Sequence, residues 1–130
     1  MTVTSGEMFS FKADAWEKGK HEAICAIVST GRREDLISYS DLSKQIISIR
    51  VEPHDYAMDR LLDEISKEEN AAGRGILTAL VVLKEERVPA EGFWASAHAI
   101  GCVIDDKWAF WIAEVKRVRM ECKKHPLCPE

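Results

Sequence analysis

The chain has 130 residues, of which 46% are hydrophobic and 31% are charged. This length and composition are typical of a single folded domain with its own core. With 22 acidic and 18 basic residues, the formal net charge is −4, which repels polyanions at long range. The longest apolar run, residues 76–83, is too short for a membrane span, and residues 1–10 lack the pattern of a secretory signal. The sequence therefore predicts a cytoplasmic protein with no membrane contact.

The N-terminal third is predicted to contain an arm, a long helix and a short helix. Residues 1–12 show no periodicity and are expected to form a flexible arm. Between residues 13 and 30 the apolar side chains recur at helical spacing, and Gly31 is expected to end this helix in a left-handed conformation. A short extended segment at 36–39 leads into a predicted helix over 41–48.

The middle of the chain is predicted to hold a third helix followed by a strand. Pro53 is tolerated in a first helical turn, and an apolar stripe at helical spacing continues to about Asn70. The β-branched run at 76–84 predicts a strand, and the polar residues 85–92 predict a turn. Phe93 begins either a short return strand or a helix that ends at Gly101.

A final helix is predicted from Asp105 to about Lys123, with basic residues in its last turns that suit the helix dipole. The expected organisation is an arm over residues 1–12, a single domain over 13–124 and a C-terminal tail over 125–130. This order of elements is that of a winged helix, with the turn at 85–92 as the wing.

Two stretches also carry a resemblance. Residues 37–46 resemble the strand-to-helix entry of winged-helix domains, including the DNA-binding domain of alkylguanine alkyltransferases. Residues 77–84 and 88–93 resemble a pattern found in small bacterial proteins. Together with the order of elements, the resemblance implies an α+β, winged-helix-like fold that is mainly helical with a small antiparallel β-hairpin.

The alkyl-transfer activity is not carried over with this resemblance. That family has a reactive cysteine in a Pro-Cys-His-Arg motif, whereas Cys102 lies in an Ile-Gly-Cys-Val sequence without a neighbouring His or Arg to lower its pKa. The four cysteines include no CxxC pair, and all four are expected to be reduced thiols. Cys25 and Cys102 lie in apolar runs and are expected to be small core residues.

No catalytic or metal site is predicted. Cys122, His125 and Cys128 place three possible zinc ligands at short spacing, but a structural zinc site needs four, and a tail with incidental thiols explains the same spacing. The chain lacks a Gly-x-Ser-x-Gly motif and a phosphate-binding glycine loop. The sequence therefore predicts a protein that is not an enzyme and needs no cofactor.

The third helix is strongly acidic for its position in a winged-helix order. In a DNA-reading domain this element is the recognition helix, where phosphate contacts require Lys and Arg. Residues 54–69 instead hold six acids against Arg60 and Lys67, a net charge of −4. The six acids form the predicted partner-binding surface: Asp55, Asp59, Asp63, Glu64, Glu68 and Glu69.

This charge favours a non-catalytic protein-binding module for a basic protein partner. An immunity or antitoxin protein that neutralises a cationic nuclease is one example, and a plain solvated helix face is the other explanation of the stripe. The alternative function is a winged-helix transcriptional regulator, although the charge disfavours nucleic acid. Its contacts would come from the basic end of the last helix, namely Lys116, Arg117, Arg119, Lys123 and Lys124. The sequence fixes neither the partner nor the oligomeric state.

Overall fold

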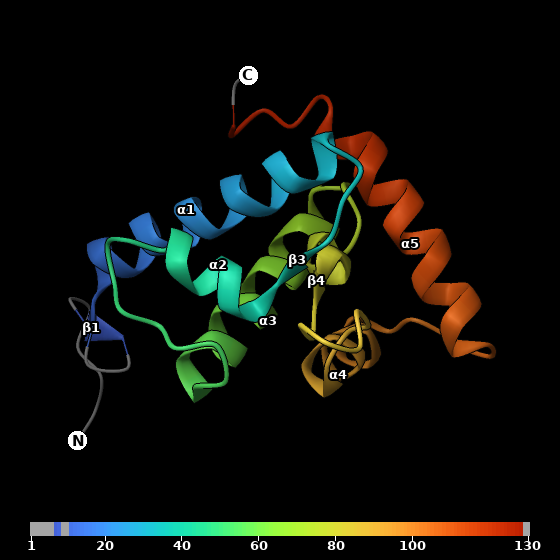
Figure 1. The fold of residues 1–130 in the computed structure, drawn as a ribbon, viewed down its shortest axis with the longest axis horizontal. Helices are drawn as coiled ribbons and strands as arrows, with labels where there is room; N and C mark the ends of the chain where they lie inside the picture. The colour runs from blue at the N-terminus through green and yellow to red at the C-terminus, as the bar shows by residue number, and fades with distance from the viewer. Residues whose placement is uncertain (1–6, 9–10, 129–130) are drawn as a thin grey trace.

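The structure is a computed structural model that describes residues 7–8 and 11–128 (Figure 1). The described residues form a mainly helical α+β fold. Its α-helices are α1 (Ala13–Arg32), α2 (Tyr39–Gln45), α3 (Tyr56–Ala71), α4 (Glu91–Ile100) and α5 (Lys107–Cys122). A 3-10 helix, η1, covers Leu77–Leu80. The strands are β1 (Glu7–Met8), β2 (Phe11–Lys12), β3 (Ile37–Ser38) and β4 (Val81–Val82).

Helix α1 is the centre of the packing, and its contacts reach α2, α3, α5 and η1. Trp16 and Ile27 of α1 are fully buried, as are Met58, Leu61 and Ile65 of α3. These are the apolar positions that recur at helical spacing, so the periodicity predicted which face of α3 is buried. In Figure 1, α1 crosses the upper part of the molecule and α5 runs down its right side.

The predicted antiparallel hairpin at residues 76–84 is wrong. Strand β4 pairs in parallel with β3, with Ile37 opposite Val81 and Ser38 opposite Val82. Most of the rest of the apolar run is η1, and residues 91–100 form helix α4. The run is buried almost throughout, and a β-branched, fully buried segment satisfies a parallel pairing as well as an antiparallel one. The winged-helix relationship stays a prediction.

Part of the predicted N-terminal arm forms a two-stranded β-sheet. Strands β1 and β2 pair antiparallel and lie against α1. The remainder of the arm, residues 1–6 and 9–10, lies outside the described residues, as do residues 129–130 of the tail.

Several predicted helix ends differ by one to three residues from the observed ones. Helix α2 begins at Tyr39, two residues before the predicted start, and Ser38 caps it by accepting a hydrogen bond of 3.1 Å from the Asp41 amide. Asp106 rather than Asp105 caps α5 through the amides of residues 108 and 109. The predicted end of α4 is confirmed, because Gly101 takes the left-handed conformation at φ 103°.

Gly31 does not end α1, which continues to Arg32. The glycine is required instead by the close approach of α5. A Cβ placed on Gly31 would collide with the Cys122 Sγ and lie 3.0 Å from Leu80 Cδ1. The helix contact therefore depends on the missing side chain.

The cysteine prediction is wrong for two of the four residues. Cys25 of α1 and Cys128 of the tail form a disulfide across a sequence separation of 103 residues, while Cys102 and Cys122 are free. The Arg32 side chain donates hydrogen bonds to the carbonyl oxygens of Cys122 and Cys128. Residues 125–128 are thereby held against α1, above which the tail runs in Figure 1.

We expect Gly31→Ala to destabilise the protein, although alanine normally stabilises a helix interior by about 0.5–1 kcal/mol relative to glycine. Overpacking against Cys122 outweighs this gain and costs about 1–3 kcal/mol. The free energy of unfolding, measured in urea, is compared with that of Gly31→Ala/Cys122→Ala. Gly31→Ala is expected to lower the free energy of unfolding less in the Cys122→Ala background than in the parent protein. An equal loss in both backgrounds contradicts the steric explanation.

We expect Cys25→Ser to lower the free energy of unfolding by about 2–5 kcal/mol, because the disulfide closes a long loop in the unfolded chain. Cys102→Ser is the matched control, since this thiol is free. Urea unfolding without reductant measures both variants. Equal stability of Cys25→Ser and the parent protein would exclude a stabilising cross-link.

Candidate functional site

The last residue of the predicted acidic surface, Glu69, is buried and not on the surface. Its side chain is 2% exposed and accepts two hydrogen bonds from Arg74, from Nε at 2.9 Å and from the second guanidinium nitrogen at 2.8 Å. His125 Nε2 lies 2.6 Å from Glu69 Oε1. The Leu127 amide donates to His125 Nδ1, so the ring presents its Nε2 proton to Glu69. Glu69 thus anchors the tail.

Glu64 and Glu68 are engaged with the buried Lys20 of α1. The Lys20 Nζ lies 2.9 Å from a carboxylate oxygen of each, and 3.2 Å from one of Glu17. Burial alone lowers the pKa of Lys20, but the hydrogen bonds to Glu64 and Glu68 outweigh it and raise the pKa above its ordinary value. Lys20 is therefore charged and pairs with both acids, of which Glu64 is largely buried whereas the Glu68 side chain stays 56% exposed.

Asp63 also serves an internal contact. Its Oδ1 accepts a hydrogen bond of 2.8 Å from Ser96 of α4, and its Oδ2 lies 2.9 Å from the Lys67 Nζ. Burial raises the pKa of Asp63, whereas the hydrogen bonds from Lys67 and Ser96 lower it by more, so the pKa lies below its ordinary value. Asp63 joins α3 to α4.

Asp55 and Asp59 remain at the N-terminal end of α3, and both are exposed. Asp55 accepts a hydrogen bond of 3.3 Å from the Glu52 amide. Among the described residues, no cationic side chain pairs with the Asp59 carboxylate. Of the six predicted partner-binding residues, these two are exposed and have no cationic partner in the described part of the chain. Asp63, Glu64 and Glu69 serve internal contacts, and Glu68 is exposed but pairs with Lys20.

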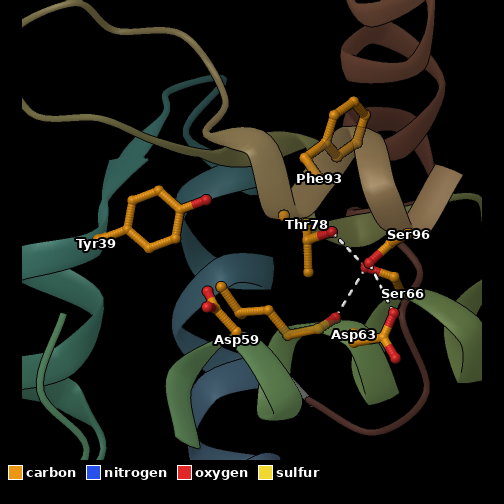
Figure 2. Close-up of a pocket in the computed structure, with 9 residues that line it drawn as sticks. Tyr39, Asp59, Asp63, Ser66, Thr78, Phe93 and Ser96 are labelled. Carbon is orange, nitrogen blue, oxygen red and sulfur yellow. Dashed lines mark hydrogen bonds between the residues drawn. The ribbon is translucent and has the colours of Figure 1, made fainter. Parts of the chain in front are cut away.

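A small polar cavity lies between α3 and α4 (Figure 2). Its volume of about 10 Å³ has room for about one water molecule. Ser66 Oγ and Thr78 Oγ1 are 2.6 Å apart, and Ser66 also donates to the Leu62 carbonyl oxygen. Tyr39 lines the other side, where burial is the main cause that raises its pKa above the ordinary value and Asp59 adds to the effect. The cavity is too small for a substrate.

An open groove adjoins this cavity at the N-terminal ends of α3 and α4, and it is called the α3–α4 groove below. Its volume is about 460 Å³, and Asp59 lines both the groove and the cavity. Glu91, the exposed first residue of α4, supplies a second carboxylate. The complete lining is His54, Asp59, Leu83, Pro89, Ala90, Glu91 and Gly92. The groove therefore combines an apolar wall with two acids and no Lys or Arg.

Glu91 shows what sequence reasoning missed. The sequence places it within the polar residues 85–92, which are predicted to form the turn of a wing. Its position as the first residue of α4, beside Asp59, depends on how α4 packs on α3. The available signals for a helix here were an acid, Glu91, shortly after Pro89 and a glycine, Gly101, at the far end.

The predicted basic set on α5 does not form one surface. Lys116, Arg119 and Lys123 share one side of the helix, whereas Arg117 and Lys124 lie on another. Three of the five have acidic neighbours: Arg117 with Glu114 at 4.0 Å, Lys123 with Glu34 at 3.5 Å and Lys124 with Glu121 at 3.8 Å. The charge available to a polyphosphate is reduced accordingly.

Cys128 is in the disulfide, so Cys122, His125 and Cys128 do not act together as thiolate and imidazole ligands in this state. The described part of the chain holds no group of three or more His, Cys, Asp or Glu residues arranged to bind a metal ion.

None of the described helices is both long and apolar enough to span a bilayer. The chain matches no protein family, and no curated protein or solved structure is significantly similar to it.

We expect the free energy of unfolding to fall as the pH drops below the ordinary carboxyl value of 4.5 for Glu69. Burial raises the pKa of Glu69, but Arg74 and His125 lower it by more, so the folded-state pKa lies below the unfolded one. Such a group stabilises the fold above its unfolded pKa, and this contribution is lost as the pH falls through the folded pKa.

The measurement is urea unfolding between pH 7 and pH 3 for the parent protein and for Glu69→Gln. At pH 7 the variant is expected to be less stable by about 3 kcal/mol, because Arg74 and His125 lose their buried carboxylate. The difference between the two proteins should shrink toward low pH. The control is Glu86→Gln, because Glu86 is exposed. If the parent protein and Glu69→Gln differ by the same free energy of unfolding at every pH, the contacts of Glu69 with Arg74 and His125 do not explain the effect.

Proposed function

We propose that the chain is a non-catalytic protein-binding module that receives a basic segment of a partner protein in the α3–α4 groove. The observation that carries this proposal is the exposed carboxylate of Asp59, which has no cationic partner among the described residues and lies on the same groove as Glu91. A partner Lys or Arg entering the groove would supply the missing charge, and a charge-assisted hydrogen bond contributes more than a neutral one.

The apolar part of the groove supports a protein partner. Leu83, Pro89 and Ala90 form its wall beside the two acids. An arginine or lysine side chain has an aliphatic stem and a charged end, so it suits a wall of this kind. The negative field also speeds the approach of a cationic partner and excludes polyanions.

A role of the immunity or antitoxin type, in which the chain neutralises a basic nuclease, is the more specific form of this proposal. It rests on the same charge, because a nuclease that grips nucleic acid presents a cationic surface. This proposal includes the cytoplasmic location expected from the sequence. The disulfide argues against that location, since disulfides are rare in the cytosol.

The test is binding of a fluorescein-labelled, Arg- and Lys-containing peptide to the full chain, measured by fluorescence anisotropy at low and physiological salt. We expect Asp59→Asn/Glu91→Gln to raise the Kd about tenfold, which corresponds to about 1.4 kcal/mol. The matched control is Asp105→Asn/Glu86→Gln, which removes the same two charges from exposed positions outside the groove.

Equal weakening by both double variants would reduce the effect to net charge and remove the groove from the proposal. Binding of random duplex DNA with a steep salt dependence would support the nucleic-acid alternative instead. Thermal unfolding of each variant shows whether the substitutions leave the fold intact.

A further inference from the structure

Helix α5 exposes large apolar side chains on the side that carries Lys116, Arg119 and Lys123. The exposed fractions are 46% for Trp108, 51% for Ile112 and 68% for Met120. The spacings of four and eight residues place these side chains along one side of the helix, with Lys116 halfway between the last two. Apolar and basic groups therefore alternate along one exposed helix surface.

This surface is hollowed along its length. A groove of about 220 Å³ is lined by Leu36, Trp111, Ile112, Val115, Lys116 and Arg119. A second hollow, of about 400 Å³, contains Lys116 and Arg119 again together with Met120, Lys123 and the acidic Glu34. The two share residues and form one depression along α5, which is called the α5 groove.

The α5 groove presents unsatisfied positive groups. The Nε atom of Arg119 is buried and has no hydrogen-bond partner among the described residues. The Lys116 and Arg119 side chains line both hollows, so their positive charge favours an acidic ligand there. Lys116 is exposed, and the neighbouring Lys123 meets a single acid, Glu34, at 3.5 Å. The groove is therefore complementary to a carboxylate beside an apolar side chain.

We propose that the α5 groove binds a short peptide segment of a partner protein in which acidic residues alternate with large aliphatic or aromatic ones. Apolar side chains of the segment cover Ile112 and Met120, and its carboxylates meet Lys116 and Arg119. This surface is separate from the α3–α4 groove and takes the opposite charge. Exposed apolar side chains gathered in a hollow with a charged rim are typical of protein-recognition sites.

Two other occupants fit the surface less well. For single-stranded nucleic acid, an open aromatic face is needed, but Trp108 contacts Trp94 and Trp111 edge-on and the Lys107 ammonium lies 5.3 Å from its ring centre. For a second copy of the chain, a two-fold contact through this side would bring like charges on Lys116 and Arg119 together.

The test begins with selection of a library of random 12-residue peptides on phage, with the intact chain immobilised. We expect the enriched peptides to carry Asp or Glu next to Leu, Ile, Phe or Trp. A fluorescein-labelled enriched peptide is then titrated with each variant in anisotropy measurements. Ile112→Glu and Lys116→Glu should each weaken binding at least tenfold.

The matched controls are Ala113→Glu and Lys124→Glu, which make similar charge changes on the same helix but outside the α5 groove. They should bind within about twofold of the parent protein. Asp59→Asn/Glu91→Gln should also bind normally, so failure of this proposal is distinguishable from failure of the α3–α4 groove.

Three outcomes overturn the proposal. The first is that the enriched peptides show no preference for acids or bind the control variants and groove variants alike. The second is that random single-stranded DNA binds more tightly than the selected peptides and loses this affinity in Lys116→Glu. The third is a dimer in light scattering that Ile112→Glu converts to a monomer, which assigns the surface to self-association.

Discussion

The buried carboxylate of Glu69 is the interaction on which the arrangement of the rest depends. It accepts hydrogen bonds from Arg74, just beyond the end of α3, and from His125 of the tail. The tail continues to Cys128, which is covalently bound to Cys25 of α1. Glu69 therefore connects α3, the following turn, the tail and α1 through one set of contacts. A buried carboxylate requires such partners, because an unpaired charge in the interior is strongly destabilising.

The same requirement explains why the number of acids in the sequence of α3 is larger than the number available on its surface. Glu64 and Glu68 both pair with Lys20, which is 5% exposed, and Asp63 accepts a hydrogen bond from Ser96 of α4. These acids are needed by the fold, so their presence in the sequence requires no external partner. Asp55 and Asp59 remain exposed without a cationic partner among the described residues, and the proposed site is smaller than the stripe because it joins Asp59 to Glu91 of a different helix.

The sequence predicts the helices well because their signals are local. The spacing of Met58, Leu61 and Ile65 identifies the buried face of α3 without any tertiary information. The remaining features depend on contacts distant in the chain. Val81 pairs with Ile37, and Cys128 bonds to Cys25 across 103 residues. No local pattern distinguishes this parallel pair from a hairpin, or a tethered tail from a frayed one. The α3–α4 groove could not be predicted for the same reason. Asp59 belongs to the predicted acidic surface, but Glu91 lies in the segment predicted as a wing.

One aromatic cluster links the two helices that carry the proposed binding surfaces. Phe93 and Trp94 of α4 pack edge-on at 5.0 Å between ring centres, and Trp94 contacts Trp108 of α5 at 6.0 Å. Helix α4, which carries Glu91, packs mainly on α3, and α5, which carries Ile112, packs mainly on α1 and η1, so the rings add a link between two helices that the core already positions. Packed aromatic contacts have specific geometry and little freedom. Both proposed surfaces lie on helices packed in this way, and binding at a preformed helix surface costs less ordering free energy than binding at a flexible loop.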